Sequence, residues 1–146
     1  MKYEDIIMRL AGNKHRLTRV RKCMVEFFSS VQSPISVEEI LQHLGEISIS
    51  ANKTTVYREL EFLLSQNIIE EVCFHDMKKR YEIAKKHHHH LVCKRCYRVE
   101  EVECNNFERE LSVVSRRLSQ KNHFAYVDHS VEFYGVCDIC SQNTIV

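Results

Sequence analysis

Four of the seven cysteines form two C-x-x-C pairs, Cys93 with Cys96 and Cys137 with Cys140. Each pair is short enough for both thiolates to reach one ion, and two pairs complete a tetrahedral sulfur site for zinc. Because four thiolates leave no open coordination position, the predicted zinc is structural rather than catalytic. A redox pair and buried free cysteines are the alternatives, and the presence of two pairs favours zinc over both.

Residues 87–90 are four consecutive histidines between two patterned segments, so they are not an expression tag. On a strand, successive side chains point to opposite faces, so His88 and His90 would point one way and His87 and His89 the other. The tetrad could thus supply two metal sites, although a solvated histidine run is the alternative. Side chains that could complete such sites are Glu82, Glu101, Glu108 and His129. Imidazole and carboxylate together suit Fe(II), Mn(II), Zn(II) or Ni(II) and do not choose among them.

The length of 146 residues allows one ordinary domain or two small ones, and 44% hydrophobic residues suffice for a core. No apolar run is long enough to span a bilayer, and the N-terminus lacks the apolar stretch of a signal peptide. We therefore expect a cytoplasmic protein whose thiols stay reduced. The net charge of +1 means that any contact with nucleic acid must come from local basic patches.

The first half predicts helices followed by a two-stranded hairpin. Ser36 with Glu39 forms a capping box that opens one of the helices. The predicted helices are a short one, with Ile6, Ile7 and Leu10 on its apolar face, and the segments 18–30, 36–44 and 50–66. The predicted strands are 68–74 and 80–83, which lie on either side of a polar turn. This order is typical of a winged helix, which lays one helix in the DNA major groove. A small helical bundle with a solvated polar face is the alternative.

The segment 50–66 is the predicted recognition helix. Its apolar residues recur at helical spacing and form one buried stripe, namely Val56, Leu60, Leu63 and Leu64. Polar residues off that stripe are Lys53, Thr54, Tyr57, Arg58 and Glu61. Basic patches that could meet phosphates are Lys14, Arg16, Arg19, Arg21 and Lys22; Lys53 with Arg58; and Lys78, Lys79 and Arg80.

The second half predicts strands at 90–93 and 99–103, joined by a cysteine knuckle, and two further strands at 124–127 and 130–136. Between them, Asn105 with Glu108 is expected to cap a helix. The apolar face of that helix consists of Phe107, Leu111, Val114 and Leu118. About sixty residues are few for an independent core, which favours both a zinc staple and a partner subunit.

Several strings resemble the ferric uptake regulator family, in the right order and over nearly the whole chain. They are RLTRVRKCMVEFF at 16–28, TTVYRELEFL at 54–63, HHHHLVCKRC at 87–96 followed by Glu101, and HSVEFYGVCDIC at 129–140. The resemblance implies an α+β fold with an N-terminal winged helix-turn-helix DNA-binding domain, residues 1–84. A small α/β dimerisation domain, residues 85–146, would follow a hinge near 84–87 and hold the structural zinc.

The resemblance also implies roles for individual residues. DNA contacts are expected from Arg19, Lys53, Thr54, Thr55, Tyr57 and Arg58. The regulatory metal site would use Glu82, His88, His90 and Glu101. The second site would use His87, His89, Glu108 and His129. The four paired cysteines would form the structural zinc site.

Three positions depart from the family pattern. Pro34 stands where iron- and peroxide-sensing relatives usually have a histidine ligand, so Glu70, Cys73 or His75 would have to substitute. His89 replaces the aspartate of many relatives and makes the second site richer in nitrogen. Tyr97 replaces the glycine that normally follows the second cysteine of the knuckle.

The implied function is that of a dimeric, metal-dependent repressor in which metal binding shifts the population toward a DNA-binding form. Fe(II) is the expected effector and Zn(II) the alternative; Glu101 and Pro34 weigh against peroxide sensing, where Asp and His are usual. A metalloenzyme is disfavoured because the catalytic motifs H-E-x-x-H and H-x-E with P-C-x-x-C are absent. A zinc-stapled interaction module that ignores DNA is a third reading.

Overall fold

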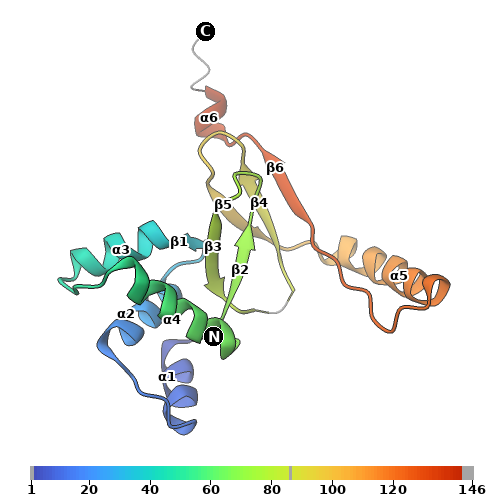
Figure 1. The fold of residues 1–146 in the computed structure, drawn as a ribbon. Helices are drawn as coiled ribbons and strands as arrows, with labels where there is room; N and C mark the ends of the chain where they lie inside the picture. The colour runs from blue at the N-terminus through green and yellow to red at the C-terminus, as the bar shows by residue number, and fades with distance from the viewer. Residues whose placement is uncertain (1, 86, 143–146) are drawn as a thin grey trace. The chain divides into compact units, whose positions relative to one another are not determined.

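The computed structural model describes residues 2–85 and 87–142. The chain divides into two compact units, residues 1–86 and 87–146 (Figure 1). Residue 86, which falls in the predicted hinge, lies outside the described residues, as do residues 1 and 143–146. None of the helices in the described ranges is both long and apolar enough to cross a membrane.

The first unit contains four helices, and three of them begin at a side-chain cap. The four are α1 (Tyr3–Gly12), α2 (Arg19–Ser30), α3 (Val37–Glu46) and α4 (Lys53–Ser65), and the capped ones are α2, α3 and α4. The Thr18 hydroxyl accepts the Arg21 N–H at the start of α2, and the Asn52 side-chain oxygen Oδ1 accepts the Thr55 N–H at the start of α4. The predicted capping box is confirmed, because Ser36 and Glu39 each accept the other's backbone N–H.

A three-stranded antiparallel sheet completes this unit. Its strands are β1 (Ile35–Ser36), β2 (Ile69–Cys73) and β3 (Lys79–Ile83), in the order β1-β3-β2 (Figure 1). The predicted hairpin is therefore present, and the unit is a winged helix. Strand β1 was not predicted, because two residues carry too little pattern to identify a strand without its partner.

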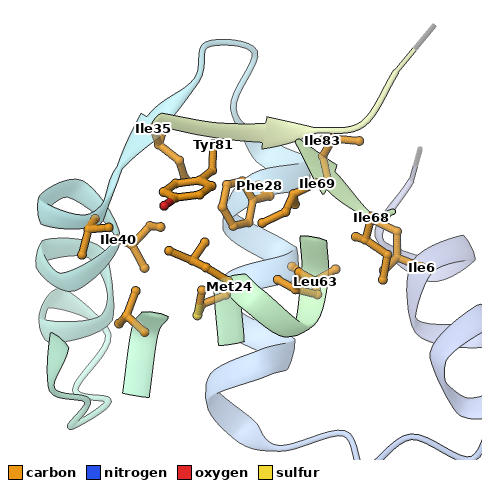
Figure 2. Packing of buried hydrophobic residues seen from close by; sticks show 14 of the residues in the cluster. Ile6, Met24, Phe28, Ile35, Ile40, Leu63, Ile68, Ile69, Tyr81 and Ile83 are labelled. Carbon is orange, nitrogen blue, oxygen red and sulfur yellow. The ribbon is translucent and has the colours of Figure 1, made fainter. Parts of the chain in front are cut away.

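The core of the first unit draws on all its helices and strands. Met24 and Phe28 of α2 lie beside Leu63 of α4, while Ile69 and Tyr81 close the core from the sheet (Figure 2). Each of these side chains is almost completely buried. The apolar stripe predicted on α4 faces this core, since Val56, Leu60 and Leu63 are the buried residues of that helix.

The second unit is built on a three-stranded mixed sheet. Strands β4 (His89–Cys93), β5 (Val99–Val102) and β6 (Glu132–Gly135) have the order β5-β4-β6, with β5 antiparallel and β6 parallel to β4. Helix α5 (Asn105–Asn122) connects β5 to β6, and the short α6 (Asp138–Gln142) follows β6. This agrees with the predicted small α/β domain.

Two local predictions for this unit are wrong. Cys104, not Asn105, occupies the N-cap of α5, without a side-chain cap, and the Glu108 carboxylate bonds to histidines instead. Residues 124–127 are not a strand, because His123 adopts a left-handed conformation and turns the chain back on the helix end. The Phe124 N–H then bonds to the Ser119 carbonyl, which leaves this segment no neighbouring strand.

Helix α5 has an apolar face without a core to cover it. None of its described residues is buried, and Phe107, Val114 and Leu118 are 37%, 47% and 45% exposed. The apolar face predicted from sequence is thus present, and the described residues of the second unit cover it only in part, at Phe107, whose ring centroid lies 6.2 Å from that of Phe133.

The wing turn supplies a test of stability against pH. Arg80 donates from both terminal nitrogens to the two oxygens of Asp76, at 2.9 and 2.6 Å. These bonds lower the pKa of the Asp76 carboxyl from 3.8 to about 2. Since the folded-state pKa is depressed, the stabilisation is complete above about pH 4 and is lost as the pH falls toward 2. We expect Asp76→Asn to lower the free energy of unfolding at pH 7 by on the order of 2 kcal/mol.

Urea unfolding of both proteins between pH 2 and pH 7 measures this difference, which should close on acidification. A constant difference across that range would contradict the assignment to Asp76.

Candidate metal centres and nucleic-acid interface

The four paired cysteines come together at one end of the second sheet. Cys93 ends β4 and lies opposite Gly135 of β6, so the parallel pairing brings the second C-x-x-C pair beside the first. All four sulfur atoms lie within 4.8 Å of one another, and those of Cys96 and Cys137 are 3.8 Å apart. Tetrahedral thiolate coordination of a zinc ion requires such a cluster.

Hydrogen bonding polarises this cluster. The Cys93 sulfur accepts the backbone N–H of Cys137 at 3.4 Å and further backbone N–H groups of the knuckle, which lower the pKa of Cys93 to about 5. The pKa of Cys140 is raised to about 12, because its thiol bonds to the sulfurs of Cys137 and Cys96. A divalent cation bound at this cluster would stabilise the thiolate form of all four cysteines.

The knuckle keeps its turn despite the missing glycine. Tyr97 takes a positive φ of 59°, and its N–H bonds to the Cys93 carbonyl at 2.9 Å. A non-glycine residue in this conformation costs about 1–2 kcal/mol. The departure at Tyr97 therefore affects the energy of the turn and leaves the cysteine positions intact.

A second cluster gathers three imidazoles around one carboxylate. Nε2 atoms of His87, His89 and His129 lie 3.4, 2.5 and 3.2 Å from the same oxygen of Glu108. Hydrogen bonds from these rings, with that of His89 the largest contribution, lower the pKa of the Glu108 carboxyl. Ligand atoms of all four residues lie within 4.8 Å of one another.

The His89 ring is oriented as a metal ligand would be, with a contact at each of its nitrogens. Its Nδ1 lies 3.0 Å from the Val131 carbonyl oxygen, which can only accept, so Nδ1 carries a proton. In neutral imidazole Nε2 then presents a lone pair toward Glu108, and this lone pair is what a histidine offers to a metal ion. Metal-binding histidines characteristically donate their other N–H to a backbone carbonyl in this way.

His88 and His90 form a separate pair, with ring centroids 4.8 Å apart. The rings alternate as predicted, since His87 and His89 belong to the Glu108 cluster. Glu101 pairs with His90 across β4 and β5, on the same sheet face. Among the described residues the carboxylate of Glu101 is not part of a gathered cluster, so its role as a ligand stays a prediction.

In the first unit, the strand register separates the three candidates for the ligand missing at Pro34. Glu70 of β2 lies directly opposite Glu82 of β3, whereas Cys73 pairs with Lys79 at the far end of the hairpin. Alternation places Cys73 on the opposite face from Glu82. His75 lies beyond the end of β2. Only Glu70 is therefore adjacent to Glu82.

Helix α4 presents the expected polar surface. Lys53, Thr54 and Arg58 are exposed, and Tyr57 is 40% exposed. Thr55 is half-buried, and its hydroxyl donates to the Asn52 side chain at 3.0 Å, so it serves the helix cap. Arg19 is exposed at the start of α2.

Each of the three predicted basic patches contains a cation that pairs with a carboxylate, and in the patch on α4 this pair is Lys53 with Glu38 at 3.2 Å. Arg21 is turned inward to Glu59, at 2.6 Å, a partner that sequence reasoning missed. Arg80 is nearly buried and bonded to Asp76, and Lys79 pairs with Glu71. These side chains face acidic partners instead of presenting free cations, so the candidate interface rests on α4, Arg19 and the loop before α2.

Comparison with known proteins places these features in a family. The family model described as "Ferric uptake regulator family" matches residues 12–134. The ferric uptake regulation protein of Bacillus subtilis is 29% identical over 143 residues, which cover 94% of this chain and 93% of that protein.

Solved structures agree. The ferric uptake regulator of Helicobacter pylori, reported with three functional metal-binding sites, has a TM-score of 0.78 at 24% identity, over 97% of this chain and 93% of that one. A zinc uptake regulator complexed with zinc and DNA has a TM-score of 0.66 at 25% identity, over 96% and 93%. The chain belongs to the ferric uptake regulator family, whose members are metal-responsive transcription regulators and not enzymes.

Proposed function

We propose that this protein is a cytoplasmic, homodimeric repressor that binds operator DNA through α4 when an effector metal, Fe(II), occupies its regulatory site. The observation that carries the proposal is the placement of metal-ligand clusters on both faces of one strand in the same chain as a winged helix. A related zinc uptake regulator has been solved with zinc and DNA, which supports the same use of the fold here.

The recognition helix would read DNA through its exposed side chains. Lys53 and Thr54 at the N-terminus of α4, together with Arg19, are suited to phosphate contacts. Tyr57 and Arg58 lie one turn further along, where they would meet base edges, since arginine pairs with guanine in the major groove. Thr55 contributes through the helix cap.

A homodimer would cover the open face of α5. Its exposed apolar residues form the kind of surface that marks an interface between subunits. Two copies would also present two recognition helices to a palindromic operator, as dimeric helix-turn-helix proteins do.

We assign the regulatory site to Glu82, His88, His90 and Glu101, with Glu70 as the substitute for the ligand lost at Pro34. Glu70 and Glu82 are carboxylates directly opposite each other across a strand pair, an arrangement that like charges destabilise. A divalent cation between them would remove that repulsion. Carboxylates with imidazoles and no thiolate are compatible with Fe(II) as the proposed effector, and they suit Mn(II), Zn(II) and Ni(II) as well.

Zinc sensing is the second candidate, favoured by the loss of the histidine at Pro34. It would gain support if Cys73 supplied a ligand, because thiolate selects zinc. The register of β2 with β3 weighs against Cys73. For the second site, His87, His89, His129 and Glu108 are the proposed ligands, and the paired cysteines would hold a structural Zn(II).

The zinc site predicts tight metal retention. We expect the purified protein to hold a zinc ion that survives dialysis against metal-free buffer, since structural zinc contributes on the order of 10 kcal/mol. Cys137→Ser should lose the ion and the cooperative unfolding of residues 87–146, whereas Cys73→Ser should keep both. Metal analysis measures the zinc content, and thermal unfolding measures the cooperativity. A zinc-free wild type that still unfolds cooperatively would refute the structural role of zinc.

The effector site is tested by anaerobic titration of operator binding with Fe(II), Mn(II) and Zn(II). We expect Fe(II) to tighten binding on the order of tenfold to a hundredfold, the usual size of an allosteric coupling. The double variant His88→Ala with His90→Ala should bind DNA equally with and without metal and remain a dimer in sedimentation. His123→Asn, which preserves the left-handed helix end, is the control. Full metal response in the double variant would remove these histidines from the site.

Glu70 and Cys73 can be separated by a matched pair of variants. Glu70→Gln should weaken Fe(II)-dependent operator binding by about tenfold or more, because it removes a ligand to the metal. Cys73→Ser should leave the response unchanged. The reverse pattern, accompanied by a response to Zn(II) alone, would favour the zinc-sensor alternative.

A further inference from the structure

Arg21 in the first turn of α2 joins three parts of the first unit. Its Nε donates to the Glu59 carboxylate of α4 at 2.6 Å, and its guanidinium lies 3.5 Å from the ring centroid of Phe62. A terminal nitrogen donates to the Arg16 carbonyl at 2.7 Å, in the loop before α2. The Arg21 and Glu59 side chains are only 12% and 13% exposed, so water screens this pair weakly.

The two residues of α4 that Arg21 contacts lie on one side of that helix. Glu59 and Phe62 are three residues apart on the helix and therefore neighbours on its surface. The buried stripe of Val56, Leu60 and Leu63 packs by apolar contacts, whose attraction is not directional and limits a small rotation of the helix only through side-chain shape. A charge-assisted hydrogen bond and a cation–π contact depend on geometry and do not tolerate such a rotation.

Other polar groups hold the same flank further along α4. The His15 ring meets Phe62 edge to face at 5.0 Å between centroids, and its Nε2 lies 3.1 Å from the Gln66 side-chain oxygen. Arg9 of α1 donates to the Gln66 carbonyl at 2.6 Å. We call the contacts of Arg9, His15 and Arg21 with Glu59, Phe62 and Gln66 the α4 clamp.

The geometry points to Arg21 as a positioning residue that sets the rotation of α4 about its own axis through Glu59 and Phe62. The inference rests on the proposed role of α4 in DNA binding. Side chains extend about 5–6 Å from a helix axis, so a roll of about 20° would displace Tyr57 and Arg58 by about 2 Å. Such a displacement exceeds the tolerance of a hydrogen bond to a base edge.

The Arg16 bond extends the effect to the loop before α2. It fixes the backbone beside Lys14 and Arg16 to the same guanidinium that holds α4. Arg21 therefore keeps the basic loop and the recognition helix in one arrangement, without contacting DNA itself.

The substitution Glu59→Gln tests the α4 clamp, because the loss of charge and the loss of positioning should change operator affinity in opposite directions. Removing a negative charge near DNA should by itself strengthen phosphate binding, so weakened operator binding can come only from lost positioning. We expect operator affinity to fall on the order of tenfold while affinity for unrelated duplex DNA stays equal or rises, because base contacts alone depend on the roll. Glu46→Gln removes the same charge from an exposed hydrogen bond on α3 and should leave both affinities unchanged.

Rescue and a DNA-free measurement complete the test. The charge swap Arg21→Glu with Glu59→Arg should recover operator affinity relative to either single change. Residual dipolar couplings of α4 amides should show a rotated helix in Glu59→Gln, with the fold retained in thermal unfolding. Unchanged couplings, or unchanged operator affinity, would overturn the inference. If the wild type ignores DNA with every metal, the proposed function fails, and the couplings still decide the clamp.

Discussion

The two-residue repeat of strand β4 is the constraint on which the second unit depends. Its pleat sends His89 to the Glu108 cluster and His90 to the opposite face, and the strand ends at Cys93 in the thiolate cluster. A slip of one residue would exchange the two histidine faces and withdraw the cysteine from its partners. Ligand binding at any of these clusters therefore also selects the register of β4 between β5 and β6.

The second unit depends on such ligands because it buries little apolar surface. Val92, Cys93 and Val99 are its buried hydrophobic residues within the described range, and α5 buries none. The first unit packs one continuous cluster from helices and sheet. A zinc staple and a second subunit would compensate for the small core, since metal binding to a site absent from the unfolded chain stabilises the fold directly.

In the first unit, apolar packing and polar contacts determine different features of the position of α4. The core sets how closely α4 approaches the other helices, whereas Arg21, His15 and Arg9 restrain its rotation from one flank. A largely buried ion pair such as Arg21 with Glu59 contributes little net stability relative to apolar packing, because desolvation offsets much of the attraction. Its value in this unit lies in geometric specificity, which a surface that reads base edges requires.

Local physics made several features predictable from the sequence. The capping box at Ser36, the inward stripe of α4, the alternation of the four histidines and the pairing of the cysteines follow from spacing over a few residues. Other features depend on contacts between distant segments, which spacing does not encode. The partner of Arg21 lies 38 residues away, and β1 exists only because β3 pairs with it.

Residues 124–127 have a strand-like composition but no neighbouring strand, since the left-handed His123 turns them onto the end of α5. Likewise, the sequence left Glu70, Cys73 and His75 equivalent, and the register of β2 against β3 placed Glu70 alone beside Glu82. Spacing along the chain determined which residues are available for chemistry. Tertiary structure decided which of them meet, because strand pairing and helix packing bring together groups that are far apart in sequence.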